Sequence, residues 1–153
     1  MRRDNATFIG CSLLLLVLAL GCARSTGLGE GDDDTRRAAL RFYDVVNQVM
    51  QSGDASAFDA VLAPDAVDHD PTPGMAPGRE GIKRAFAELR AAYPDYRVQV
   101  EYVLAERNEA SCRVVGRMTH KGRPVTLRGI DILRFDQRGL LTDRWGQFQS
   151  LPE

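Results

Sequence analysis

Two acidic regions of the chain are candidates for acid/base chemistry, and the first is Asp131. It lies in the middle of an alternating apolar stretch, where its own side of the predicted strand also carries Leu133 and Phe135. A carboxylate on an apolar strand face is costly unless it is paired, hydrogen-bonded or protonated. We therefore expect Asp131 either to have a chemical role or to pair with an arginine such as Arg117 or Arg144.

The second candidate is the run Asp68-His69-Asp70-Pro71, in which an imidazole stands between two carboxylates. Alternate side chains of an extended segment point the same way, so Asp68 and Asp70 are expected on one side and His69 on the other. Pro71 favours an extended conformation at Asp70. A carboxylate at the mouth of a loop can act as a general base, and so can a histidine. The alternative is an Asp-Pro turn whose charges are solvated.

Other kinds of chemistry find little support in the composition. The 153 residues include two histidines and three cysteines, which argues against a Cys/His metal site, and we expect neither a metal nor a cofactor. Cys112 lies in mid-strand and is expected to be a small core residue. Twenty Lys and Arg residues against 21 Asp and Glu residues give a net charge of −1. A nucleic-acid partner is not expected, because neutralising phosphates needs a basic surplus.

Three helices are expected in the first half of the domain. The first covers residues 35–52, where apolar side chains recur at helical spacing, and a shorter one follows Asp54, which can cap it. Prolines and glycines predict a loop over residues 65–78, and the third helix covers residues 79–94.

After the third helix the apolar period changes from 3.6 to 2, which predicts four strands. They cover approximately residues 98–104, 112–120, 125–135 and 140–148. Short turns between them predict an antiparallel meander. Helices followed by such a sheet predict an α+β layer fold, with the helices covering one face of the sheet.

Residues 1–21 are expected to be a signal peptide. A basic start precedes an apolar run over residues 13–20, which is too short for a permanent membrane span. Leu18-Ala19-Leu20-Gly21-Cys22 resembles a bacterial lipobox, which implies cleavage before Cys22 and acylation of its sulfur and its new amine. An uncleaved anchor and an ordinary signal peptide are the alternatives.

Two or more acyl chains anchor a protein stably to a membrane. Residues 22–34 are rich in glycine and aspartate and are expected to form a flexible tether, whereas residues 35–153 form one domain. We therefore expect an exported protein of the bacterial cell envelope, held at the membrane by its N-terminal lipid.

Several short motifs of the predicted domain stand in a distinctive order. They are Ser52-Gly53-Asp54, residues 62–71, Gly78-Arg79-Glu80-Gly81-Ile82, Thr119-His120-Lys121-Gly122, and residues 129–136 followed by Gly139 and Trp145. Together they resemble the SnoaL-like and ketosteroid-isomerase-like proteins of the nuclear transport factor 2-like superfamily. This resemblance implies a cone in which three N-terminal helices pack on a curved, mostly antiparallel sheet around an apolar pocket, often dimeric through the sheet.

The resemblance also implies roles for single residues. Asp70 falls at the position of the isomerase's proton-shuttling carboxylate, and Asp131 at that of its protonated, oxyanion-stabilising carboxylic acid. His69 or His120 is implied as an auxiliary group. Cyclases of the SnoaL type often carry an aspartate after the last-strand tryptophan, where this chain has Gly146 instead.

The activity implied by the resemblance is cofactor-independent acid/base catalysis, of the cyclase or isomerase type, on a small apolar carbonyl compound. The alternative is a membrane-tethered domain that binds an apolar ligand or a partner protein without catalysis, and a homodimer is possible in either case. The pocket is expected to be lined by Tyr43, Val46, Leu62, Phe86, Met118, His120, Trp145 and Phe148. The isomerase's tyrosines fall near Val46 and on Leu62 and Phe86, and Tyr43 lies one helical turn from Val46.

Overall fold

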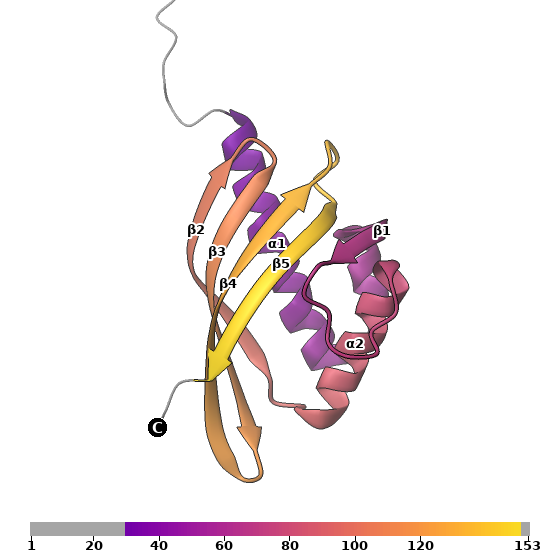
Figure 1. Cartoon of the computed structure of the whole chain (residues 1–153), viewed down its shortest axis with the longest axis vertical. Helices are drawn as coiled ribbons and strands as arrows, with labels where there is room; N and C mark the ends of the chain where they lie inside the picture. Colours follow the sequence, from indigo (N-terminus) through magenta and orange to yellow (C-terminus); the bar gives the residue numbers. More distant parts are fainter. Residues whose placement is uncertain (1–29, 151–153) are drawn as a thin grey trace, which may run out of the picture.

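The computed structural model describes residues 30–150, which form two layers (Figure 1). Two α-helices and a 3₁₀ helix pack on one face of a curved five-stranded sheet. The elements in chain order are α1 (Glu30–Ser52), η1 (Ala55–Ala60), β1 (Leu62–Asp68), α2 (Gly78–Ala92), β2 (Arg97–Glu106), β3 (Glu109–His120), β4 (Arg123–Phe135) and β5 (Leu141–Ser150). The predicted signal peptide, and the predicted tether as far as residue 29, lie outside the described residues.

The sheet has the strand order β1-β5-β4-β3-β2. Neighbouring strands from β2 to β5 are antiparallel, as the meander pattern predicted, and β1 pairs with β5 in parallel. The α+β class and the mostly antiparallel sheet are therefore confirmed. Of the three predicted helices, the first and third are α-helices, and the short one after Asp54 is a 3₁₀ helix, whose start Asp54 caps by accepting the backbone N–H of Ser56.

Helix α1 begins earlier than its apolar pattern indicates. The prediction started it at Thr35 and placed residues 30–34 in the tether, but these residues form its first turns. Acidic side chains are favourable at a helix N-terminus, and Asp32 accepts a hydrogen bond from the backbone N–H of Arg107 at 2.7 Å. Thr35 is buried and donates its hydroxyl to the carbonyl of Arg107 at 2.6 Å.

Strand β1 is the main element that the sequence did not predict. The segment 62–68 was expected to finish a helix and enter a loop, and it contains Pro64, which cannot donate a ladder hydrogen bond. The strand lies at the edge of the sheet, and its register with β5 is irregular between Leu62 and Val67, the interval that contains Pro64. Proline is tolerated at sheet edges and bulges, and the pairing partner lies about eighty residues away in sequence.

Strand β4 carries the predicted alternation. Asp131 is paired in register with Cys112 of β3 and Gly146 of β5. Its side chain points toward the helices, as do those of the buried Leu133 and Phe135. The core on this face also contains apolar side chains of α1, such as Phe42, Val46, Val49 and Met50. The buried carboxylate therefore lies between the helical layer and the sheet.

The outer face of the sheet exposes large apolar side chains. Tyr102 and Leu104 of β2 and Ile130 and Ile132 of β4 each have more than two fifths of their surface exposed. A homodimer through this face stays a prediction. Within residues 30–150, no helix is both long enough and apolar enough to cross a bilayer.

Gly81 provides a test of how α2 packs on the segment before it. It is buried, and a Cβ atom at this position would lie 1.7 Å from the carbonyl oxygen of Ala76, a backbone atom that cannot rotate away. We expect Gly81→Ala to lower the free energy of unfolding by about 2–3 kcal/mol, as overpacked sites do. Urea denaturation measures this change.

The control is Arg84→Ala, which alters an exposed residue of the same helix and should change the free energy of unfolding by less than about 0.5 kcal/mol. Equal stabilities of Gly81→Ala and the wild type would contradict the close approach.

Candidate functional site

A cavity of about 310 Å³ lies between the helices and the inner face of the sheet. Its walls are mostly apolar, and its polar groups come from α1, from the end of β1 and the loop after it, from the residue before β2, and from β4 and β5. The lining residues are Phe42, Tyr43, Val46, Asp68, Asp70, Thr72, Met75, Ile82, Ala85, Phe86, Leu89, Tyr96, Val98, Leu127, Asp131, Arg144, Gly146 and Phe148.

Asp131 is the most deeply buried charged side chain of this cavity, with 1% of its surface exposed. Its Oδ2 atom accepts a hydrogen bond from the hydroxyl of Tyr43, and its Oδ1 atom accepts one from Nη2 of Arg144, each at 2.7 Å. Asp131 therefore pairs with an arginine, which was one of the two expectations from the sequence, and the partner is Arg144. Arg117 instead hydrogen-bonds Gln99.

The ionisation of these three groups is set by burial and by their mutual contacts. Burial raises the pKa of Asp131 above its ordinary value, and the Arg144 guanidinium and the Tyr43 hydroxyl offset part of that rise. Burial, together with the nearby Asp131 carboxylate, also raises the pKa of Tyr43, so its hydroxyl keeps its proton. Burial lowers the pKa of Arg144, but the carboxylates of Asp131 and Asp68 outweigh this effect and raise it, so Arg144 stays cationic.

Arg144 is shared by two carboxylates. Its Nη1 atom donates to Oδ2 of Asp68 at 2.7 Å, while Nη2 holds Asp131. The guanidinium needs the space beside Gly146, since a Cβ atom there would lie 2.2 Å from Nη2 of Arg144 and 2.3 Å from Oδ1 of Asp131. The absence of a side chain at position 146 therefore permits the ion pair to close.

Asp70 lies at the cavity mouth on the other side of Gly146. Its Oδ2 atom accepts the backbone N–H of Gly146 at 2.9 Å, and its Oδ1 atom accepts Nε2 of Gln147 at 3.1 Å. The backbone N–H of Asp70 in turn donates to Oδ1 of Asp68 at 3.1 Å. The structure thus brings Asp70 and Asp131, which are 61 positions apart in sequence, to the two sides of one glycine in one cavity.

His69, which the sequence placed among the catalytic candidates, does not line this cavity. Its ring stacks on Trp145 with centroids 4.3 Å apart, and its Nε2 atom lies 2.9 Å from Oδ1 of Asp143. Trp145, which was also expected in the pocket, lies outside it, because its ring packs against His69. The alternation of side chains predicted for Asp68, His69 and Asp70 is confirmed, and it directs the histidine away from the pocket.

Of the other residues expected to line the pocket, Tyr43, Val46, Phe86 and Phe148 do so. Leu62, Met118 and His120 do not. Leu62 is fully buried in the core, and His120 lies near the tip of the β3–β4 hairpin, where its Nδ1 atom is 3.2 Å from the hydroxyl of Tyr93.

Two charged residues, Asp68 and Arg144, line the cavity although the sequence did not predict them as lining residues. The alternation argument had placed Asp68 on the side of Asp70. Arg144 was named as a possible partner of Asp131, but nothing local showed that it also binds Asp68.

Burial raises the pKa of the Cys112 thiol to about 12, which fits its expected role as a core residue and not as a nucleophile.

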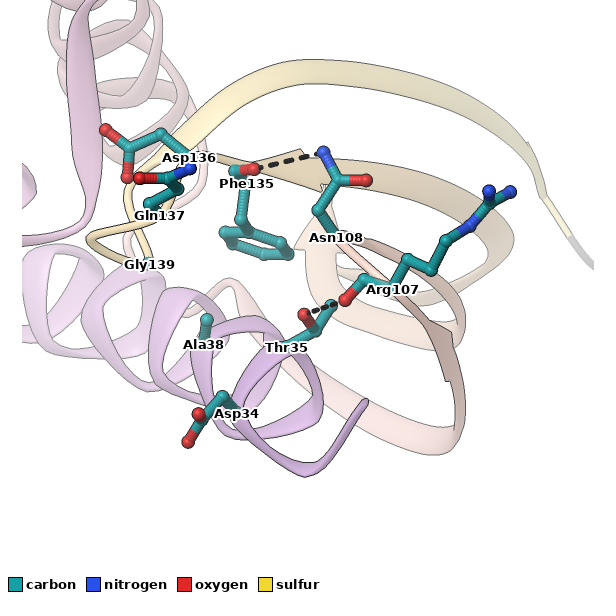
Figure 2. A pocket seen from close by; sticks show the side chains of 9 residues that line it. All are labelled: Asp34, Thr35, Ala38, Arg107, Asn108, Phe135, Asp136, Gln137 and Gly139. Carbon is teal, nitrogen blue, oxygen red and sulfur yellow. Dashed lines mark hydrogen bonds between the residues drawn. The ribbon is translucent and has the colours of Figure 1, made fainter. Parts of the chain in front are cut away.

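A second cavity of about 600 Å³ opens at the N-terminal end of α1 (Figure 2). Its polar groups are largely engaged with one another: Thr35 binds the carbonyl of Arg107, and Asn108 Nδ2 binds the carbonyl of Phe135 at 3.3 Å. Asp136 accepts from the backbone N–H of Leu140 at 2.9 Å. These contacts close two turns against the helix and present no paired acid and base, so the smaller, apolar cavity is the better candidate site.

Among residues 30–150 there is no group of three or more histidine, cysteine or acidic side chains arranged to hold a metal ion.

Comparison with known proteins points to one family. The sequence profile of the SnoaL-like domain matches residues 39–144. No protein with a curated description matches the chain at a significant level of sequence similarity.

Solved structures share the fold. A proposed polyketide cyclase of Bacillus cereus ATCC 10987 is 24% identical with a TM-score of 0.66, over 76% of this chain and 74% of that one. IdmH, a proposed polyketide cyclase of Streptomyces antibioticus, is 24% identical with a TM-score of 0.64, over 75% and 91%. A proposed SnoaL-like polyketide cyclase of Jannaschia sp. CCS1 is 15% identical with a TM-score of 0.67, over 79% and 89%. At these identities the likeness shows the architecture.

The ion pair predicts a pH-dependent loss of stability in Arg144→Met. Removing the guanidinium leaves Asp131 buried without its cation, which costs about 3–5 kcal/mol at neutral pH. The folded-state pKa of Asp131 then rises further above the value of about 3.9 in the unfolded chain. Because a carboxyl with a raised folded-state pKa loses stabilisation as pH rises through that window, the free energy of unfolding of Arg144→Met should fall from acid to neutral pH more steeply than that of the wild type.

Urea denaturation at a series of pH values measures the effect. The double variant Asp131→Asn with Arg144→Met is the control and should show much less of this pH dependence. A constant difference between Arg144→Met and the wild type at all pH values would contradict the assignment.

Proposed function

The chain belongs to the SnoaL-like domain family, and from this premise we propose that its apolar cavity catalyses proton transfer on a small carbonyl compound, of the cyclase or isomerase type. The observation that carries the proposal is the convergence of Asp70 with the Tyr43–Asp131–Arg144 network in one apolar cavity. Such a pairing of a base with charge-stabilising groups is what removal of a proton next to a carbonyl requires.

Asp70 is the proposed base. Both of its oxygens accept hydrogen bonds from neutral donors, the amide of Gly146 and the side chain of Gln147. No arginine, lysine or histidine among residues 30–150 lies within ion-pair distance of it, whereas Asp68 and Asp131 share Arg144. Asp70 is therefore the carboxylate of the three that is not engaged by a cation and that is available to a substrate proton.

Tyr43, Asp131 and Arg144 are the proposed stabilisers of the negative charge that develops on the substrate oxygen. Arg144 supplies a fixed positive charge inside an apolar site, where it acts more strongly than in water. The Tyr43 hydroxyl keeps its proton and donates to Asp131, so the tyrosine is held in the cavity as a neutral donor. The chain thereby supplies a neutral donor and a cation to one enolate oxygen without a cofactor.

The walls of the cavity indicate the size and polarity of the substrate. Its volume of about 310 Å³ is at the lower end of the range for small-molecule sites. Most of its surface is apolar, and its lining includes phenylalanine, isoleucine, leucine and valine side chains, so a compact apolar body would fill it. Two of the similar structures are proposed polyketide cyclases, and this supports ring closure as the reaction we propose for this chain.

Asp70→Asn tests the proposal. A panel of small apolar ketones, esters and lactones is incubated with the purified domain, and products are followed by mass spectrometry and by exchange of the proton next to the carbonyl with deuterium. For any compound that the wild type converts, the substitution should lower kcat by about 10²–10⁴-fold, as loss of a general base does.

The matched control is Asp65→Asn, which makes the same change of charge at an exposed position of strand β1, five residues before Asp70, and should leave kcat unchanged. Binding of panel compounds without conversion or proton exchange would contradict catalysis and would favour the alternative, a tethered ligand-binding domain.

We propose further that the chain is exported and anchored by a lipid on Cys22. The support is the order of a basic start, an apolar run and the lipobox-like residues 18–22 in the sequence. The described domain begins at residue 30, so only seven residues separate its first helix from the proposed anchor. Such a short linker keeps the domain within roughly 25 Å of the headgroups.

Expression in a bacterium fed with radiolabelled palmitate checks the anchor. The wild-type chain should carry label and sediment with membranes, whereas Cys22→Ser should lose the label. Cys112→Ser is the control, because this thiol is buried in the core. Equal labelling of wild type and Cys22→Ser would refute the anchor.

A further inference from the structure

His69 packs on the outer side of β5 through two separate side chains. Its ring lies flat on the indole of Trp145, with an angle of 2° between the planes. Its Nε2 atom contacts the carboxylate of Asp143 at 2.9 Å. Stacking of this kind and a hydrogen bond to a charged group are each favourable, so His69 is held from two directions.

A third side chain supports both partners of His69. The guanidinium carbon of Arg134, on the neighbouring strand β4, lies 5.0 Å from the centroid of the Trp145 ring, and Nη1 of Arg134 lies 3.7 Å from Oδ2 of Asp143. Arg134 is also paired with Glu109 at 2.8 Å. Side chains of β3, β4 and β5 therefore form the surface on which His69 packs.

The two neighbours of His69 contact the same strand from the cavity side. Asp68 binds the guanidinium of Arg144, and Asp70 binds the backbone N–H of Gly146. Asp68 and Asp70 therefore contact β5 from the cavity side, and His69, whose side chain points the opposite way, contacts it from the outer side.

Backbone pairing with β5 holds Asp68 and His69 but does not extend to Asp70. The parallel pairing of β1 with β5 is interrupted after Leu62 and resumes at Val67 and Asp68, and the backbone N–H of His69 donates to the carbonyl of Arg144 at 2.8 Å. From residue 69 to 77 the chain is in neither helix nor strand. The contacts of Asp70 with β5 are therefore made by its side chain alone, next to a residue whose backbone is fixed on that strand.

We propose that His69 is a positioning residue, which holds Asp70 at the cavity mouth by packing its ring on Trp145 and Asp143 on the opposite side of β5. This inference rests on the proposed function, in which Asp70 is the base. His69 acts through the backbone at residues 69 and 70, and it does not touch the substrate.

The amide of Gly146 is the reporter for this proposal, because it donates to the Asp70 carboxylate. In His69→Ala, the native-state NMR resonance of the Gly146 amide proton should move upfield, and its exchange with solvent should become roughly tenfold faster as the local contact opens more often. For any compound that the wild type converts, kcat should fall roughly tenfold with KM changed less than about twofold, because the base is misplaced and the apolar walls are intact.

Two further variants make the test specific. His69→Phe keeps an aromatic ring for Trp145 and loses the contact with Asp143, so it should recover part of both effects. His120→Ala removes the other histidine, which also contacts an aromatic side chain, Tyr93, but lies outside the cavity. It should leave the Gly146 resonance and kcat unchanged.

The outcomes separate this proposal from the catalytic one. An unchanged Gly146 resonance and exchange rate in both His69 variants would overturn the positioning role, even if the wild type proves to be an enzyme. Faster exchange of all amides alike, with no native-state shift at Gly146, would assign His69 to general stability and would also overturn it. A shifted Gly146 resonance in a domain that converts no panel compound would support the positioning role and remove the catalytic function.

Discussion

A carboxylate buried opposite a guanidinium is the interaction on which the rest of this site depends. Asp131 is almost completely enclosed between helices and sheet, a place where an unpaired charge would be very costly. Arg144 and Tyr43 supply the donors that make the position tolerable, one from the neighbouring strand and one from the first helix. The helical layer and the sheet therefore each contribute one partner of Asp131. These polar contacts connect the two layers at the cavity within an otherwise apolar core.

The same pair constrains residues around it. Arg144 reaches Asp131 only because Gly146 has no side chain, and it also binds Asp68, so the edge strand β1 is drawn to β5 by charge. The backbone N–H of Gly146 remains available for Asp70. Position 146 is where cyclases of the SnoaL type often have an aspartate; here the space holds a guanidinium, and the acidic groups of the cavity come from β1, from the loop after it and from β4 instead.

The two faces of β5 have different chemistry. Its inner face carries Arg144 toward the cavity, and its outer face carries Asp143 and Trp145, which receive His69. The tripeptide 68–70 contacts both faces because its side chains alternate. A histidine that contacts no substrate can thus still be connected to a carboxylate in the cavity, through one peptide unit.

Local pattern was enough for much of this molecule. Helical and alternating periodicity located the α-helices and the four antiparallel strands to within a few residues, and a charged residue in an apolar strand marked Asp131 as a buried group that needs a partner. Alternation also placed Asp68 and Asp70 together and His69 apart from them. These features depend on backbone geometry that repeats every few residues, so a linear sequence displays them. By contrast, strand β1, the double role of Arg144, and the exclusion of His69 and Trp145 from the cavity depend on contacts between segments about 75 positions apart. The choice of Arg144 over Arg117 as the partner of Asp131 depends on the pairing of β4 with β5. Such contacts arise only when the strand order β1-β5-β4 forms, because pairing across a sheet leaves no local trace in either partner.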